Sequence, residues 1–311
     1  MLCETYNHEA HYLCFQSNAR PVALIPIVEV LSPFTGRRGV CLPFSDACGP
    51  LLFQDESLGV IRQHLAELCR RRKWRHLELR GDNQLDGVCE HVPTFYGHTL
   101  YLGSDPDALF ATFANGTAGA VKQAIKNGVT VEISRDSAAV KNFYSLQVET
   151  RKKHGIPPQP YTFFANVHCK MIAAGLGFTA LARSAGRVIA GAIFLQNTRR
   201  AVYKFAASDP EFSTSRGNNL VLWEAIRHLI SSGCEQLDFG RTSPDHDGLR
   251  RFKLSWGAEE KLIRYSQFDV KHGRWSQQIR HDREGIANRI FRNLPSAANR
   301  LAGAMLYPHL D

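Results

Sequence analysis

The sequence has 311 residues, of which 44% are hydrophobic and 22% are charged, a composition typical of a packed globular protein. This composition excludes wholesale disorder and collagen-like or coiled-coil architectures, and the length predicts two domains. The formal net charge of +9 favours acidic partners, such as nucleic acid, nucleotides, phosphorylated lipids or an anionic membrane surface, without choosing among them.

No apolar run approaches the roughly 18–20 residues needed to span a bilayer, and no basic segment leading into an apolar one follows Met1. The cysteines are scattered and include no C-x-x-C pair, which favours reduced thiols over a disulfide framework. The sequence therefore predicts a cytoplasmic protein.

In chain order, strands and helices alternate. Strands over 11–16 and 21–30 flank a short polar turn and predict a hairpin. A helix over 57–73 follows, and its terminal arginines complement the helix dipole without any need for nucleic acid. A strand over 76–81 comes next, and Asp105 predicts the N-cap of a further helix that reaches Phe113.

The same order returns later in the chain. Helices over 137–153 and 162–174 precede a second hairpin, whose strands are predicted at 178–183 and 188–196. A helix over 219–231 and a strand over 236–241 complete this set. We therefore predict two copies of one α/β unit, of which the first lacks its helices at the front.

From about residue 276, apolar residues alternate with arginines, and Pro295 divides this basic tail into two pieces. The pattern leaves two interpretations open. The tail is either an amphipathic helical segment docked on the body of the protein or one that rests on an anionic membrane surface.

Motifs for metal and nucleotide chemistry are absent. His8 and His11 have the spacing H-x-x-H and lack the i, i+4 pair that places two imidazoles on one helical face. The Asp-His-Asp-Gly run at 245–248 is more typical of a turn. No dinucleotide fingerprint, P-loop or nucleophile elbow occurs, so we predict no metal site and no Rossmann or P-loop chemistry.

Polar groups gather where the strand at 236–241 ends, at the tip where α/β sites usually lie. Arg241 can clamp a carboxylate or phosphate there, and Asp238 can take a proton, although a plain ion pair between them is an equal alternative. Lys253, next to Phe252 and near Trp256, is suited to stabilise an oxyanion or a phosphate.

Two more segments are candidates for the same cleft. Arg216 and the flexible Gly217 precede the 219–231 helix and can seat a phosphate or carboxylate, with Asn218 as the N-cap in the simpler interpretation. Earlier in the chain, Asp46 is the only acidic or basic residue in the polar kink at 43–50.

These segments together resemble the FemAB-like members of the GNAT superfamily, also described as BioF2-like acetyltransferase domains. The resemblance covers roughly residues 43–308 and rests on segments 43–50, 155–160 with 163–164, 208–209, 218–220 with 223, 238–241, and 252–253 with 256–257. The tail segments 294–303 and 306–307 look like members that accompany exopolysaccharide or PEP-CTERM systems.

The resemblance implies an α/β (α+β) fold with two tandem GNAT-like domains, each a mixed sheet flanked by helices. We expect an N-terminally incomplete first domain at 1–115, a second domain at 116–270 and an amphipathic basic tail at 271–311. Better-known relatives transfer an amino acid from aminoacyl-tRNA to a peptidoglycan precursor amine, and others are taken to use acyl-CoA. In those relatives the lysine of the Phe-Lys motif serves the acceptor phosphate or the transition state, which points to Lys253.

The expected function is an N-acyltransferase that modifies an amine of a cell-envelope or exopolysaccharide precursor, with acyl-CoA or aminoacyl-tRNA as donor and a saccharide or peptidoglycan-type acceptor. The tail would allow peripheral contact with the inner membrane face. Expected catalytic residues are Lys253, Asp238 and Asp46. The expected substrate-binding residues are Arg241, Asn218, Asn219, Phe252, Trp256 and Arg216.

One departure from the family pattern concerns an acceptor phosphate. Relatives usually carry an Arg-Asn-x-x-Arg-Lys-like run near 118–124, where this chain keeps only Lys122 and, just beyond, Lys126. One alternative is therefore a non-catalytic subunit on a GNAT scaffold that recognises an anionic saccharide or lipid-linked intermediate. Another is an RNA-binding protein, which is disfavoured because aromatic residues do not alternate with the basic runs.

Overall fold

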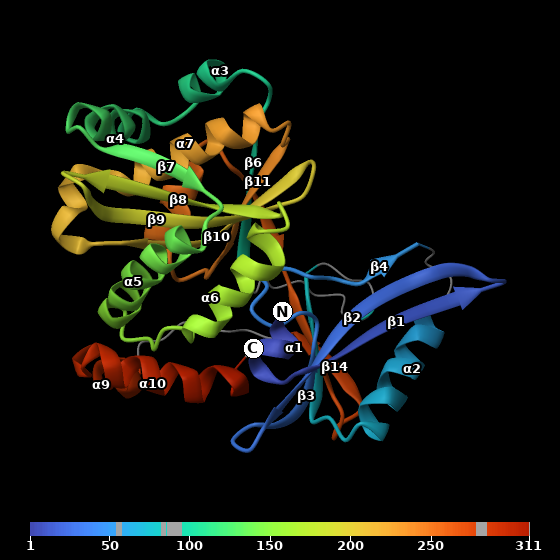
Figure 1. Ribbon diagram of the computed structural model, residues 1–311. Coiled ribbons are helices and arrows are strands. Elements are labelled where there is room, and N and C mark those ends of the chain that lie inside the picture. The colour runs from blue at the N-terminus through green and yellow to red at the C-terminus, as the bar shows by residue number, and fades with distance from the viewer. Residues whose placement is uncertain (54–57, 82–84, 86–94, 278–284, 311) are drawn as a thin grey trace.

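The computed structural model describes all residues except 54–57, 82–84, 86–94, 278–284 and 311. Two mixed β-sheets, each with helices packed against it, form two adjoining lobes (Figure 1). In the described part of the chain, no helix has the length and apolar character required to cross a membrane. The described cysteines are all free thiols.

The first lobe is built on a sheet with the strand order β1-β2-β3-β5-β13-β14, in which β4 also pairs with β2. Its strands are β1 (Glu9–Ser17), β2 (Arg20–Ser32), β3 (Gly36–Val40), β4 (Leu51–Leu52), β5 (His76–Arg80), β13 (Tyr265–Asp269) and β14 (Arg274–Gln277). The amphipathic helix α2 (Leu58–Arg71) buries Ile61, Leu65 and Leu68 against one face of this sheet.

The second lobe has the strand order β12-β6-β11-β10-β9-β8-β7. Its strands are β6 (Phe95–Tyr101), β7 (Thr130–Ser134), β8 (Gly177–Ser184), β9 (Arg187–Gln196), β10 (Arg200–Ser208), β11 (Gln236–Thr242) and β12 (Glu259–Ile263). Helices cover both faces. They are α3 (Pro106–Ala111), α4 (Asn115–Lys126) and α7 (Gly217–Ser231) on one side and α5 (Ser137–Lys153) and α6 (Tyr161–Val167) on the other, with α8 (Asp247–Leu254) after β11.

The two predicted hairpins are confirmed, and their turns match. Asn18 and Ala19 in the first turn, and Ala185 and Gly186 in the second, all have positive φ between 48° and 79°. Two consecutive residues with positive φ form the turn whose twist fits a two-residue hairpin. In each lobe a further strand, a helix and a parallel strand follow, which confirms the two-copy fold class.

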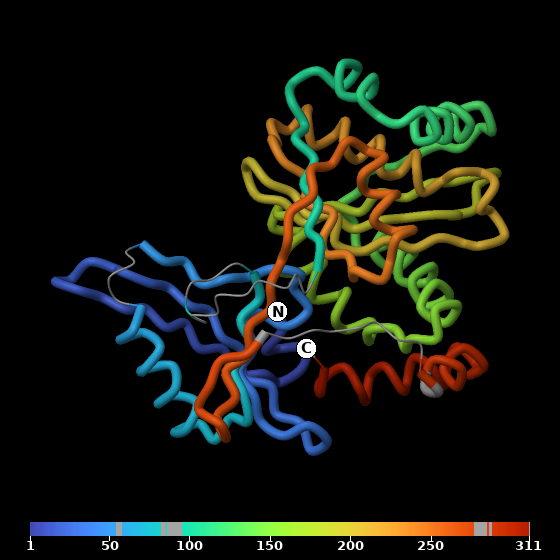
Figure 2. Tube along the Cα trace, turned by 180° about the vertical axis from the view of Figure 1, so that it is seen from behind, coloured from blue at the N-terminus to red at the C-terminus, as the bar shows by residue number. Residues whose placement is uncertain are grey.

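The lobes exchange strands. After β5 the chain crosses to the second lobe, where β6 pairs with β11 and β12, and after β12 it returns so that β13 pairs with β5. Figure 2 shows the orange segment running from β12 directly into β13. The division between the sheets therefore does not coincide with the boundaries at 115 and 270 expected from the sequence, because β6 and β13 each lie in the other lobe's sheet.

Two helices differ from the sequence prediction. The helix expected at 219–231 begins at Gly217, so Asn218 lies in its first turn and Arg216, with φ 57°, is the N-cap. Gly217 allows the start of this helix to pack closely on β9, because a Cβ there would lie 3.1 Å from the Ile189 side chain. The helix expected at 162–174 is α6 followed by a wider π-helical turn, η1 (His168–Ile172), in which the amide of Ala173 donates to the carbonyl of His168.

The tail expected at 271–311 begins later than predicted, because Arg274–Gln277 form β14 in the first sheet. The remainder forms α9 (Ile286–Asn293), α10 (Ser296–Leu306) and the short turn η3 (Tyr307–His309), while residues 278–284 lie outside the described residues. The buried face of α10 packs closely on the chain before α6, because a Cβ on Gly303 would lie 1.9 Å from the Pro158 carbonyl oxygen. The opposite face exposes Leu301 and Met305. The tail is therefore docked on the body, and membrane contact through its exposed face stays a prediction.

Candidate functional site

Residues 42–47 form a loop that reaches from the first lobe to the second, and three successive carbonyl groups anchor it. The Phe44 carbonyl accepts from Lys204 Nζ at 2.6 Å, the Ser45 carbonyl from Arg80 Nη1 at 3.1 Å and the Asp46 carbonyl from the Tyr265 hydroxyl at 2.7 Å. These donors come from β10, β5 and β13, so both sheets fix the loop. We call residues 42–47 the bridging loop.

The conformation of the bridging loop is unusual. Leu42 and Phe44 both have positive φ, at 50° and 60°, which is unfavourable for residues with a Cβ. Such strain persists only where surrounding contacts enforce it, and it is common at functional sites. The three anchored carbonyls supply that enforcement.

Strands β10 and β11 part where the bridging loop meets them. They pair in parallel only from Arg200 with Gln236 to Val202 with Asp238. Beyond this point the register of β10 shifts around Lys204, and the register of β11 shifts between Asp238 and Arg241. Bulges of this kind change the direction of a side chain and are frequent beside active sites.

The charged groups of both lobes converge at this opening. The Asp46 carboxylate lies 3.8 Å from Lys204 Nζ and 3.6 Å from Arg241 Nε. The Arg241 guanidinium also stacks over the ring of Phe95 at 4.2 Å and donates to the Tyr265 hydroxyl at 2.8 Å. Asp46 and Arg241, two of the residues expected from the sequence, therefore lie together.

Asp238 and Lys253 lie beside this group, but their side chains bond to backbone groups of β11. An Asp238 carboxylate oxygen accepts from the backbone amide of Gly240 at 2.6 Å, which supports the bulge of β11. Lys253 is only 4% exposed, and its Nζ donates to the carbonyls of Gly240 and Arg241 at 2.8 and 2.9 Å. Burial lowers the pKa of Lys253 to about 8, against the opposing effect of the Asp46 and Asp238 carboxylates.

A polar cavity of about 410 Å³ lies on one side of the bridging loop. Its charged lining residues are Asp46, Arg80, Arg151, Lys204 and Arg241. We call it the cationic chamber, since four of these five lining residues are cationic. Gln147 and Gln159 also line it, are each 4% exposed, and have Oε1 atoms that accept no hydrogen bond within the described part of the chain. The chamber is therefore suited to an anionic ligand that also carries hydrogen-bond donors.

A second cavity, of about 380 Å³, also borders the bridging loop. Its walls are mainly apolar. The residues that line both cavities are Phe44, Ser45, Asp46, Lys204 and Phe205. We call it the apolar chamber.

The other expected substrate-binding residues lie elsewhere. Arg216, Asn219 and Phe252 line a surface hollow between the N-terminal ends of α4 and α7, whereas Asn218 is exposed beside it. Trp256 is fully buried and packs edge-on against Phe113 in the core of the second lobe. The structure thus places the expected residues in three separate environments.

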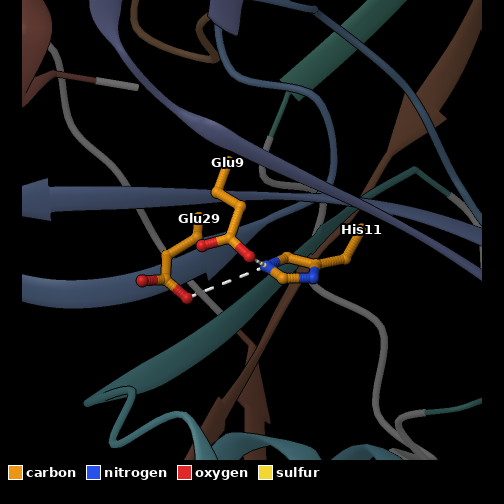
Figure 3. A group of neighbouring side chains, drawn as sticks. All are labelled: Glu9, His11 and Glu29. Atoms are coloured by element: carbon orange, nitrogen blue, oxygen red, sulfur yellow. Dashed lines mark ion pairs between the residues drawn. The ribbon is translucent and has the colours of Figure 1, made fainter.

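Glu9, His11 and Glu29 form a cluster on the first sheet whose ligand atoms lie within 4.8 Å of one another (Figure 3). Both carboxylates already have cationic partners. Arg72 bonds to Glu9 and Glu29, and the Trp74 indole donates to Glu29 at 2.7 Å. The cluster is therefore an ion-pair network that joins the end of α2 to the sheet.

The sequence-based prediction missed Lys204, Arg80 and Tyr265. The one available signal was the position of Lys204 inside an otherwise apolar strand, Val-Tyr-Lys-Phe-Ala, where a charge needs a partner. Arg80 ends a strand and Tyr265 begins one, and neither position is unusual by itself.

Comparisons with known proteins agree with this architecture. Residues 114–258 match the family model of the acetyltransferase (GNAT) domain. The fold is similar to that of FemX, with a TM-score of 0.64 and 14% identity, covering 84% of this chain and 88% of that one. No curated protein matches the sequence.

Two further solved structures have a similar fold. A tandem GNAT protein from the clavulanic acid biosynthesis pathway has a TM-score of 0.54 and 12% identity over 85% of this chain and 83% of that one. The C-terminal domain of a putative lysylphosphatidylglycerol synthetase from Agrobacterium fabrum has a TM-score of 0.56 and 13% identity over 82% of each chain. The chain thus shares the overall fold of FemX and of this tandem GNAT protein, and its residues 114–258 match the model of the GNAT acetyltransferase domain.

Proposed function

We propose that this protein is an N-acyltransferase that moves an acyl or aminoacyl group from a thioester or ester donor to the amine of an acceptor. The observation that carries the proposal is the convergence of Asp46, Lys204 and Arg241 from two lobes at the opening between β10 and β11. Aminolysis of an ester or thioester needs positioning, removal of a proton and stabilisation of an oxyanion, and these three groups can supply all of them.

Each residue has a distinct role in this proposal. The Asp46 carboxylate takes the proton of the attacking amine, and Asp238 is the alternative base because it lines the apolar chamber beside it. Lys204 stabilises the oxyanion, and Arg241 binds anionic charge on the acceptor in the cationic chamber. We infer a positioning role for Lys253, since its ammonium group is occupied by the two carbonyls of β11.

The proposed acceptor and donor sites are the cationic chamber and the hollow between α4 and α7. The cationic chamber suits a phosphorylated or otherwise anionic saccharide or peptidoglycan-type acceptor, as expected for a cell-envelope or exopolysaccharide precursor. The hollow at Arg216 and Asn219 lies at the N-terminal end of α7 and suits a phosphate of the donor, whether acyl-CoA or aminoacyl-tRNA.

The test is an amide-forming assay with the full chain. Acetyl-CoA, longer acyl-CoA thioesters and aminoacyl-tRNA are offered in turn with amino sugars, amino-sugar phosphates and muropeptides, and products are detected by mass. We expect one donor class to give an acylated amine, and Asp46→Asn to lower the rate about 100-fold. Saturable ligand binding without turnover of any donor would instead favour the non-catalytic binding protein.

A further inference from the structure

The apolar chamber opens to solvent through large apolar side chains. Tyr12 and Leu42, which line it, are 75% and 38% exposed. Exposed apolar groups around a cavity are typical of a binding site, and the volume of about 380 Å³ is in the range of small-molecule pockets. The walls come from both lobes, from Ala10 and Val28 on the first sheet to Val167 on α6 and Leu195 on β9.

The charged lining residues of the apolar chamber are Asp46, Lys204 and Asp238. Two of these belong to the ion pair at the opening between β10 and β11, and Asp238 is the register partner of Val202 at the last paired position of these strands. A ligand that matches such a chamber has a long apolar part and one polar reacting group at its end.

We propose that the apolar chamber binds the alkyl chain of a long-chain acyl thioester and presents its carbonyl group to Lys204 and Asp46. This inference rests on the proposed acyl transfer. The amine nitrogen of the acceptor forms a bond to the carbonyl carbon while Asp46 takes its proton. The carbon–sulfur bond then breaks, and the leaving thiolate takes up that proton, which restores the carboxylate.

The chamber and the bridging loop separate the two substrates. The alkyl chain lies on the apolar side of Phe44, and the anionic part of the acceptor lies on the cationic side. A charged acceptor is disfavoured in the apolar chamber, because the desolvated charge would find few polar partners there.

Chain length is the variable that tests the proposal. Each methylene group removed from water is expected to strengthen binding about fourfold until the chamber is full. Dissociation constants of acetyl-, butyryl-, octanoyl- and dodecanoyl-CoA are measured below their critical micelle concentrations, by displacement of a fluorescent dansyl-labelled fatty acid. We expect affinity to rise with chain length and then to level off.

A matched pair of variants on β1 locates the binding site. Ala10→Trp places a large ring in the chamber at an exposed strand position, whereas Gln16→Trp places the same ring farther along the same strand, outside the chamber lining. We expect Ala10→Trp to weaken dodecanoyl-CoA binding at least tenfold and acetyl-CoA binding much less. Gln16→Trp is expected to match the wild type with both ligands.

These measurements test binding in the apolar chamber separately from the acyl-transfer step. Affinities that do not depend on chain length, or an equal effect of the two tryptophan variants, would overturn the chamber proposal even if acetyl transfer proceeds. Chain-length-dependent binding that Ala10→Trp abolishes supports the chamber proposal as a binding site, and if no amide forms with any donor, the transfer step is overturned.

Discussion

Lys253 is the residue whose position differs most from its sequence-based interpretation. A lysine between aromatic residues suggested direct contact with an oxyanion, but its ammonium group lies behind β11 and donates to the Gly240 and Arg241 carbonyls. Burial lowers its pKa from 10.5 to about 8. The sequence identified the residue, but not the direction in which its side chain points, because that depends on how α8 packs behind β11.

The lowered pKa of Lys253 has a consequence for stability. The unfolded chain keeps the proton up to pH 10.5, whereas the folded chain releases it near pH 8, so the unfolded state binds more protons between these values. The free energy of unfolding contributed by this group therefore rises with pH across that window. We expect the unfolding free energy of the wild type, measured relative to that of Lys253→Met, to increase by roughly 2–3 kcal/mol from pH 8 to 10.5.

Urea unfolding at several pH values measures this difference. Lys261→Met removes an exposed lysine on β12 and serves as the control, for which we expect the wild-type pH dependence. Parallel pH curves for the wild type and Lys253→Met would mean that the buried amine titrates as it does in the unfolded chain.

At the scale of single elements, the bulge of β11 lies against the Asp46 side chain of the bridging loop. Gly240 has φ 72°, and a Cβ at this position would lie 2.6 Å from an Asp46 carboxylate oxygen. Gly186 has a similar φ of 79° in a hairpin turn with open space around it. A substitution at either glycine would strain the backbone, because both have positive φ. Only Gly240 lies next to a residue of the site.

This pair gives a direct prediction. Gly240→Ala and Gly186→Ala are both expected to lose about 1–2 kcal/mol of stability, because alanine disfavours positive φ. Only Gly240→Ala is expected to lower acyl transfer, by about 10- to 100-fold, since its methyl group displaces Asp46. Thermal unfolding and the amide-forming assay measure the two effects, and equal activity of the two variants would show that Asp46 need not occupy its observed position.

Local sequence patterns predicted many elements well. The helix expected at 137–153 is α5 with the same bounds, because Gly155 and the prolines after it end the apolar period there. Both hairpins follow from polar turns between apolar strands. The bulges at Lys204 and Gly240 had no such signal, since a shift in register depends on the partner strand and not on the period of one strand.

At the scale of the whole molecule, the exchange of β6 and β13 between lobes explains why the sequence-based domain boundaries differ from the sheets. The alternation of apolar residues along a segment predicts a strand, but it does not predict which sheet the strand joins. The exchange brings Tyr265 on β13 to the Asp46 carbonyl and Arg241 on β11, so the site depends on both lobes. Residues 204, 241 and 46 are far apart in the sequence, and only the assembled fold brings them together.

The central claim is that this junction, and not some other surface, carries out acyl transfer. Lys204→Met removes the cation that holds the Phe44 carbonyl and pairs with Asp46. Arg199→Met removes a cation that pairs with Glu235 just before β10 and lines neither chamber.

The decisive measurement is the rate of amide formation by these two variants with saturating donor and acceptor. We predict a loss of about 100-fold for Lys204→Met, as expected when one preorganised oxyanion donor is removed, and a rate within about twofold of the wild type for Arg199→Met. Equal rates for Lys204→Met and the wild type would contradict a reaction at the junction of the lobes.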